Sequence, residues 1–479
     1  MKNKLSGAAE GAHTFSYLTV FILLVWILPD HANAQEQVPL TLPQAIDTGI
    51  KNYPSIKARQ NYVSAAQALT RNARNEYLPN VIASAQQNYG TINGQYGPGA
   101  PIGVLGVASS GPVYSKQNWN AAFGALYIIS TNWEVYTFGR VQSRIQLGVA
   151  QERQNSSDLE QEMFVQKIKI ASSYLNLLIA QRLVESAKSN LTRAQTIQQN
   201  VIARTLSGLN PGVDSSLVNA DVSKAKLSLI DFITNEQTIQ RQLAELIGIG
   251  TDVSFTPDAT LITTIPEIPG RAAAVTQNPQ LLFYRARVGY ANQLANVARK
   301  SILPGVTLFG VYQARGSGFN YTYNPENLTG YSNRYQNGID PSRYNYVAGV
   351  SVTWNLTSPV KIRQQVKAQR FLAAGYQNEY EQLGNQLQNQ LILSDQRIVN
   401  TLQSAQEVPV QYKAASDAYL QKNVLYKNGL TTMVELQQAM YVLNRAEIDK
   451  SVAYANVWLA LLLKSAASGD FNLFTNPTQ

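Results

Sequence analysis

Residues 75–82 read NEYLPNVI, and residues 300–307 read KSILPGVT. In both places a helical segment rich in Ala, Gln and Arg runs into Leu-Pro, and residues typical of a β-strand follow. Proline lacks an N–H donor and disfavours helix in the residue before it, so Pro79 and Pro304 should each end a helix. The sequence therefore predicts the same event twice, a helix that passes directly into a strand.

The two stretches belong to an internal repeat. Pro54 precedes Pro79 by the same number of residues as Pro279 precedes Pro304. A second constant offset relates the following pairs: Trp133 and Trp354, Arg140 and Lys361, Gly208-Leu209 and Gly429-Leu430, Asp214 and Glu435. Landmarks that keep fixed offsets over such a distance predict two copies of one structural unit.

We expect the first repeat to cover residues 35–250 and the second to cover residues 251–479. Each should contain a short helix, two strands, a long helix and a return helix. In the first repeat these elements span about residues 54–76, 80–90, 121–136, 139–207 and 211–247. In the second they span about residues 279–301, 305–315, 346–357, 359–428 and 432–465. Loops 91–118 and 316–345, rich in turn-forming residues, join the strands.

The expected strands alternate between an apolar side and a small or polar side. Val350, Val352 and Trp354 point one way, and the residues between them are small or polar. The alternation is less clean in the second strand of the first repeat, where Leu126 and Ile128 fall on the polar side. The pattern still favours strands with one face against an apolar medium.

The long helical segments of about 69 residues would each reach roughly 100 Å at about 1.5 Å per residue. Helix starts are marked by Ser358-Pro359, by Asn210-Pro211 and by a capping box, Thr432-x-x-Glu435. Pro409 should kink the second long helix or interrupt it near Glu407. The sequence thus predicts two tall, antiparallel helical hairpins.

Residues 1–34 have the pattern of a secretory signal peptide. Lys2 and Lys4 precede an apolar core at 17–28, and an Ala-Asn-Ala cleavage site occupies 32–34. About twelve apolar residues are too few to span a bilayer. We therefore expect export of a mature chain that begins at Gln35.

The amino-acid composition excludes most kinds of catalytic site. The chain has no Cys, and its two His residues, His13 and His31, lie in the expected signal peptide. The mature chain would offer no Cys or His metal ligand, no Ser-His-Asp triad and no thiol nucleophile. No nucleotide-binding G-x-x-x-x-G-K-[ST] motif is present. We expect no catalytic residue, metal or cofactor, and an enzyme built on a carboxylate pair is only a third alternative.

The net charge of +9 does not point to a nucleic-acid partner, because Lys and Arg are spread along helical patterns without a basic run.

The four expected strands cannot form a closed barrel on their own. Four strands of about ten residues have membrane-spanning length but cannot close a barrel, and open sheet edges are not tolerated in lipid. Two copies would give a filled eight-stranded barrel, whereas three begin to leave a passage. We therefore favour three or more copies.

The alternative is a trimeric coiled-coil surface or adhesion protein without a channel, with loop 316–345 as its binding element. It explains the helices. It does not explain why strand pairs sit between helices in both repeats, with Trp133 and Trp354 at one end. Aromatic residues are typical of membrane interfaces, and these two are our candidates for interface anchors.

Together these motifs resemble those of the TolC-like outer-membrane efflux proteins. The segments that carry the likeness are LTLPQAIDTGIKNYP, N-x-Y-L-P, W-x-V-Y-x-F-G-R and YKNGLTTMVELQQA. The resemblance implies a mixed, mostly α homotrimer, in which a long antiparallel α-helical barrel of coiled-coil hairpins joins a transmembrane β-barrel with four strands per chain. It also implies an outer-membrane duct for small molecules or proteins, with the helical barrel in the periplasm. Implied partners are a periplasmic adaptor, an inner-membrane transporter and outer-membrane lipid.

In the family the second hairpin carries a tyrosine, an arginine and two acidic residues that bond or constrict the entrance. The resemblance assigns this periplasmic gate to Tyr426, Thr431, Glu435 and Gln438, and Asp214 is the candidate in the first hairpin. Thr431 and Gln438 depart from the pattern, which puts an arginine latch and one acidic ring in doubt. Glu435 and Asp214 also fit as helix-start acids, and Tyr426 also fits as a packing aromatic.

The hairpin tips are candidates for adaptor contact. Gly208-Leu209 and Gly429-Leu430 would expose apolar side chains there, as a surface with a partner does. The alternative is a purely structural reversal of the helix at glycine.

Overall fold

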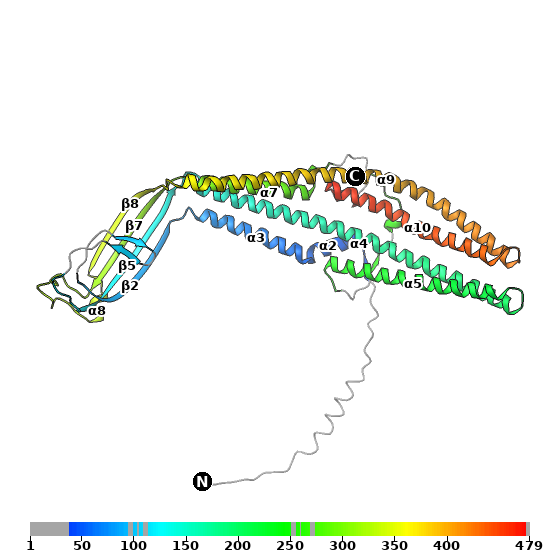
Figure 1. Ribbon diagram of the computed structural model, residues 1–479, viewed down its shortest axis with the longest axis horizontal. Helices are drawn as coiled ribbons and strands as arrows, with labels where there is room; N and C mark the ends of the chain where they lie inside the picture. The colour runs from blue at the N-terminus through cyan, green and yellow to red at the C-terminus, as the bar shows by residue number, and fades with distance from the viewer. Residues whose placement is uncertain are drawn as a thin grey trace, which may run out of the picture.

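The computed structural model describes residues 38–93, 99–102, 105–108, 114–250, 255–258, 260–268 and 274–475. The molecule is long and narrow, with helices at one end and a β-sheet at the other (Figure 1). The expected signal peptide, residues 1–34, and part of the expected loop 91–118 lie outside the described residues. Of the helices in the described ranges, none has an apolar stretch long enough to cross a membrane.

The chain enters the sheet twice and returns to the helical end each time. The first pass consists of α3 (Pro54–Asn75), β2 (Asn80–Thr91), β5 (Ala121–Tyr136), α4 (Arg140–Leu206) and α5 (Gly212–Ile247). The second consists of α7 (Pro279–Lys300), β7 (Gly305–Ser317), β8 (Arg343–Thr353), α9 (Ser358–Lys427) and α10 (Met433–Ser468). The order of elements is the same in both passes. β8 ends before residue 357, where we expected its end, because its pairing with β7 stops at Thr353 although the apolar alternation continues.

Smaller elements occupy the middle of the helical region and the far end of the sheet. The middle contains β1 (Val38–Leu40), α2 (Leu42–Asn52), β6 (Phe255–Pro257), α6 (Thr260–Thr263), η2 (Val275–Gln277) and α11 (Asn472–Thr475). The outer end of the sheet carries β3 (Gly99–Ile102), β4 (Leu105–Ala108) and α8 (Tyr335–Ile339). The largest buried core lies in the middle region, where Tyr174 of α4 donates to the Leu40 carbonyl at 2.8 Å. Its packing fixes the relative positions of the helices.

The main sheet is antiparallel in the order β2-β5-β7-β8, and its register separates two faces. The apolar face includes Val81, Ala83, Ile129, Trp133, Leu308, Tyr312, Tyr346, Val350 and Val352. The polar face includes Asn80, Ser84, Gln86, Asn132, Glu134, Thr307, Gln313, Arg315, Arg343, Asn345 and Ser351. Leu126 and Ile128 lie on the polar face, as their place in the alternation predicts. β2 and β8 are the edge strands of this sheet.

A tryptophan fastens each helix-to-strand turn. Trp133 Nε1 donates to the Tyr77 carbonyl at 2.8 Å, and Trp354 Nε1 donates to the Ile302 carbonyl at 3.0 Å. Each carbonyl belongs to the residue two positions before the proline of its turn. The repeat seen in the sequence therefore extends to individual hydrogen bonds.

The long helices α4 and α9 contain 67 and 70 residues, and the return helices contain 36 each. We expected Pro409 either to kink α9 or to interrupt it near Glu407, and the helix continues through Pro409 without interruption. Proline removes one hydrogen bond from the helix, and α10 packs along this part of α9, where Gln411 Nε2 donates to Asp449 Oδ2 at 3.3 Å. The ribbon of α9 does bend in its orange part (Figure 1).

The starts of two helices also differ from expectation by one residue. Thr357, rather than Ser358, is the N-cap of α9, and Pro211, rather than Asn210, is the N-cap of α5. At neither N-cap does the side chain of the cap residue accept a hydrogen bond from a backbone N–H of the first helical turn. The Asn210 side chain is instead used at the hairpin tip, as described below.

Candidate functional site

The two hairpin tips lie together at the end of the molecule farthest from the sheet (Figure 1). Both helices end in the same backbone motif, in which the N–H of Leu209 or Leu430 bonds to the carbonyl five residues earlier at 2.9 Å. Gly208 and Gly429 have φ of 76° and 74°, which favours glycine. Leu209 and Leu430 are 70% and 72% exposed. Each tip therefore presents an exposed leucine at its turn.

A polar cluster joins the first tip to the second. Asn210 Nδ2 donates to the Tyr426 hydroxyl at 2.7 Å and to Asp214 Oδ2 at 2.9 Å. Arg204 Nε donates to Asn210 Oδ1 at 3.1 Å, and its Nη1 donates to the Lys427 carbonyl at 2.7 Å. We call these five residues the tip cluster. It brings together two expected site residues, Tyr426 and Asp214, from different hairpins.

Tyr426 is buried in this cluster with only 6% of its surface exposed. Burial is the main cause that raises its pKa, and the nearby Asp214 carboxylate raises it further, whereas the hydrogen bond from Asn210 and the Arg204 charge act in the opposite direction. The Arg204 guanidinium also lies over the tyrosine ring, 5.8 Å from its centre. Tyr426 is thus both a packing aromatic and a hydrogen-bond acceptor between hairpins.

Glu435 and Thr431 form a second contact within the other hairpin. Lys422 Nζ of α9 donates to Glu435 Oε2 at 2.6 Å, and the Thr431 hydroxyl donates to the same carboxylate oxygen. These hydrogen bonds, that from Lys422 first, lower the pKa of the exposed Glu435 carboxyl. The predicted capping box is therefore only half formed. The Thr432 hydroxyl accepts from the Glu435 N–H at 3.3 Å, but the Glu435 carboxylate points to Lys422 instead of the N-cap.

Gln438 does not join either contact. It is exposed on α10 and lines a groove between α5 and α10 together with Asp221 and Lys224. In the same groove the neighbouring Gln437 donates to the Asp221 carboxylate. Of the expected gate residues, the structure therefore groups Tyr426 with Asp214, groups Thr431 with Glu435, and leaves Gln438 apart.

Three residues of these contacts were missed by the sequence reasoning: Arg204, Asn210 and Lys422. When the two repeats are aligned, Asn210 corresponds to Thr431. Asn210 donates to Asp214, and Thr431 donates to Glu435, which in each case is the acidic residue four positions later. That correspondence was available in the sequence. Arg204 and Lys422 have no basic counterpart in the other repeat, so no signal in the sequence marked them.

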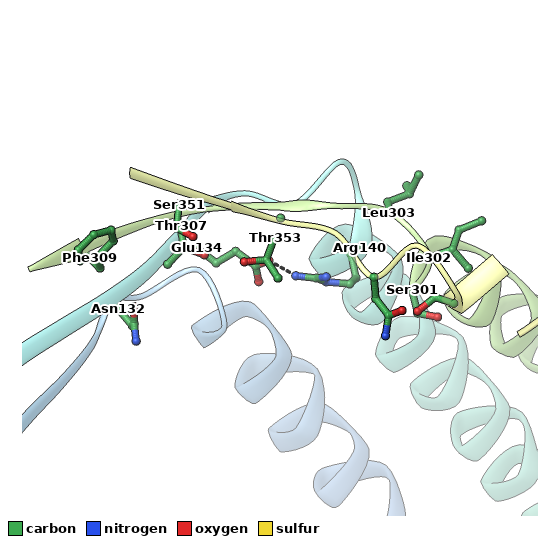
Figure 2. Close-up of a pocket in the computed structure, with 13 residues that line it drawn as sticks. Asn132, Glu134, Arg140, Ser301, Ile302, Leu303, Thr307, Phe309, Ser351 and Thr353 are labelled. Carbon is green, nitrogen blue, oxygen red and sulfur yellow. Dashed lines mark hydrogen bonds and ion pairs between the residues drawn. The ribbon is translucent and has the colours of Figure 1, made fainter. Parts of the chain in front are cut away.

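A second polar site lies at the junction between helices and sheet. Figure 2 shows Glu134 of β5 and Arg140 of α4 joined by an ion pair, close to the turn after α7 and the end of β8. They line a cavity of about 640 Å³ with Asn132, Thr307 and other polar residues. An added Cβ at Gly305 would collide with the Glu134 carboxylate. A side chain at this position would therefore have to displace the end of the Glu134 side chain.

The comparisons agree with this architecture. The family model described as "Outer membrane efflux protein" matches residues 45–249. No curated protein sequence matches the chain. Among solved structures, the chain is similar to the outer-membrane channel OprN, with 17% identity, a TM-score of 0.69 and 89% of both chains covered.

Two further structures show the same fold. The Campylobacter jejuni CmeC outer membrane channel has 14% identity and a TM-score of 0.71, with 89% of this chain and 85% of that chain covered. The open state of the Neisseria gonorrhoeae MtrE outer membrane channel has 15% identity and a TM-score of 0.70, with 90% and 89% covered. The chain therefore shares its fold with these outer-membrane channels, and residues 45–249 match the family of outer membrane efflux proteins.

Proposed function

We propose that three copies of the mature chain form an export duct through the outer membrane. The observation that carries this proposal is the sheet, which has one apolar face and two edge strands, β2 and β8. Lipid offers no partner for the backbone groups of an edge strand, so these edges must pair with other chains. Three copies of the four-stranded sheet supply twelve strands, enough to leave a passage.

The aromatic residues of the apolar face support a membrane position. Trp133 lies at the helical end of that face, and Trp354 follows the last residue of β8. Tyrosines occupy the other end: Tyr89, Tyr127, Tyr312, Tyr344 and Tyr346. Two aromatic girdles that flank an apolar band are typical of outer-membrane barrels. In this proposal outer-membrane lipid contacts the band between the girdles.

The long helices support assembly of several copies. α9 exposes many large apolar side chains: Val360, Phe371, Leu372, Ile392, Leu393, Val399, Val410, Leu420 and Val424. Soluble surfaces rarely expose so much apolar area without a partner. Neighbouring copies would bury these side chains and complete a helical barrel that projects into the periplasm.

The tip cluster is the proposed closing element. It ties the hairpin α4–α5 to the hairpin α9–α10 through Asn210, Asp214 and Tyr426, and Lys422 holds Glu435 close to α9. The Thr431 hydroxyl donates to Glu435 at the position where the family pattern has an arginine. Separating the hairpins requires loss of the contacts between them, so the resting duct is closed at the tips.

The exposed Leu209 and Leu430 give the tips an apolar contact surface for a periplasmic adaptor. Gly208 and Gly429 position these leucines by reversing the chain. An inner-membrane transporter then supplies the energy, and the duct passes small molecules or proteins from the periplasm to the exterior.

The test is the purified mature chain in a planar bilayer, with its detergent-corrected mass measured in parallel. We expect the mass of a trimer and small, mostly closed conductances. A chain that stays soluble without detergent and gives no conductance would contradict the proposed duct.

A further inference from the structure

The outer end of the polar face contains a cavity that the proposed transport path does not by itself explain. The cavity has a volume of about 670 Å³ and lies at the end of the sheet away from the helices. Its polar lining includes Gln86, Asn88, Arg315, Ser317, Arg343 and Asn345. Among the lining residues that the structure describes, Arg315 and Arg343 are the charged ones.

Arg315 and Arg343 are direct cross-strand partners. β7 pairs with β8 so that these two residues lie opposite each other, and both side chains are on the polar face. Like charges placed directly opposite destabilise a sheet. Neither arginine forms an ion pair with any residue that the structure describes, and Arg343 Nη1 donates only to the Ser342 carbonyl, at 2.7 Å. The pairing therefore concentrates positive charge without an internal counterion.

Acidic residues are scarce around this cavity. Residues 80–133 contain Lys116 and no Asp or Glu. In residues 305–357 the acids are Glu326 and Asp340, and neither forms an ion pair with the two arginines. Glu134 lies on the polar face at the other end of β5, roughly 26 Å along the strand from the partner of Arg315, and is already paired with Arg140.

We propose that Arg315 and Arg343 form an anion-binding site on the wall of the duct, close to its outer opening. The inference rests on the proposed function, because the polar face must line the duct for a solute to reach the site. Guanidinium groups bind carboxylate, phosphate and sulfate oxygens in pairs, and the amides of Gln86 and Asn88 offer further donors. Three copies place three such arginine pairs around one opening.

The ligand is a solute and not a lipid headgroup. The arginines point to the polar face, whereas lipid would contact the apolar face on the opposite side of the sheet. The site therefore suits a small anion that carries two or more negative oxygens and leaves through the duct.

The probe is inorganic pyrophosphate, added to one side of a planar bilayer that contains the full-length mature protein. We expect it to block the wild-type conductance from the outer side. The variant R315Q/R343Q should need an at least about tenfold higher concentration, since charge-assisted hydrogen bonds are lost. K116Q removes one outer-loop charge from each copy and is the control, and R315K/R343K should retain part of the block.

Calorimetric titration of pyrophosphate into the detergent-solubilised wild type and R315Q/R343Q separates this inference from the duct itself. Weaker binding by R315Q/R343Q, in a protein that gives no conductance, would uphold the site and contradict the duct. Equal block or equal binding in the wild type and R315Q/R343Q would overturn the site, whether or not the duct conducts.

Discussion

At the scale of single residues, the hairpin tips are joined by the Asn210 amide, which donates to Tyr426, and by the Arg204 guanidinium, which donates to the Lys427 carbonyl. Asn210 contacts Asp214 in its own hairpin and Tyr426 in the other, and Arg204 fixes the orientation of the amide. Each contact is an ordinary hydrogen bond. In the proposed duct, the balance between a closed and an open tip should therefore respond to the loss of one atom.

Tyr426→Phe removes the hydroxyl that accepts from Asn210 and leaves the buried ring. We expect it to weaken the closed tip by about 1 kcal/mol, or roughly fivefold in the ratio of open to closed channels. Single-channel recording in a planar bilayer measures this ratio. Tyr441→Phe, at an exposed tyrosine of α10, is the control. Equal open probability in Tyr426→Phe and wild type would remove Tyr426 from the gate.

The contact between Glu435 and Lys422 predicts a pH dependence. The pKa of Glu435 is lowered in the folded protein, so the contact is complete above the ordinary glutamate pKa of about 4.3 and is lost as the pH falls through the lowered value. If this contact helps to keep the duct closed, the conductance should stay constant between about pH 7 and pH 5 and rise only in stronger acid, where the contact is lost. Glu435→Gln should lack this acid-induced rise. A rise of the same size in Glu435→Gln would assign it to another group.

At the scale of elements, the reversal of each hairpin depends on a glycine with positive φ. Gly429→Ala should destabilise the protein by about 1 to 2 kcal/mol, because an L side chain is strained in this region. Gly375 lies inside α9 with open space around its Cα, so Gly375→Ala should stabilise by about 0.5 to 1 kcal/mol. Thermal unfolding of the detergent-solubilised protein measures both changes. If both variants shifted the melting temperature in the same direction, the different roles assigned to Gly429 and Gly375 would be wrong.

The position of the tryptophans tests the apolar face. Variants that retain only Trp133 or only Trp354 should be quenched strongly by brominated lipid, whereas a variant that retains only the buried Trp458 should be quenched weakly. Steady-state fluorescence in reconstituted vesicles measures the quenching. If Trp133 and Trp354 are quenched no more than Trp458, the helical end of the apolar face does not lie at a membrane interface.

The elements differ in how far the sequence could predict them. The ends of α3 and α7 follow from Pro79 and Pro304, because the effect of proline is local. The continuity of α9 across Pro409 depends on helices packed along it, which a local rule does not include. The contact of Arg204 with the carbonyl of Lys427 joins residues from different repeats and becomes visible only when both hairpins are in place.

At the scale of the whole molecule, the proposed duct covers the edge strands and the exposed side of α9 with other copies of the chain, and the apolar face with lipid. The edges β2 and β8 are separated by β5 and β7, which places them roughly 14 Å apart within one sheet. A disulfide requires Cα atoms within about 7 Å. A cross-link between these edges therefore reports pairing between chains and not within one chain.

The most direct measurement of the central claim is this cross-link, since the natural chain contains no Cys. Ala83→Cys on β2 is combined in turn with a cysteine at Ala348, Val350 or Val352 on β8, all on the apolar face, and the protein is oxidised in lipid vesicles. A barrel closed by three chains should give covalent trimers for at least one combination, and no species larger than a dimer for any single cysteine. Monomers alone for every combination would contradict a barrel closed by three chains.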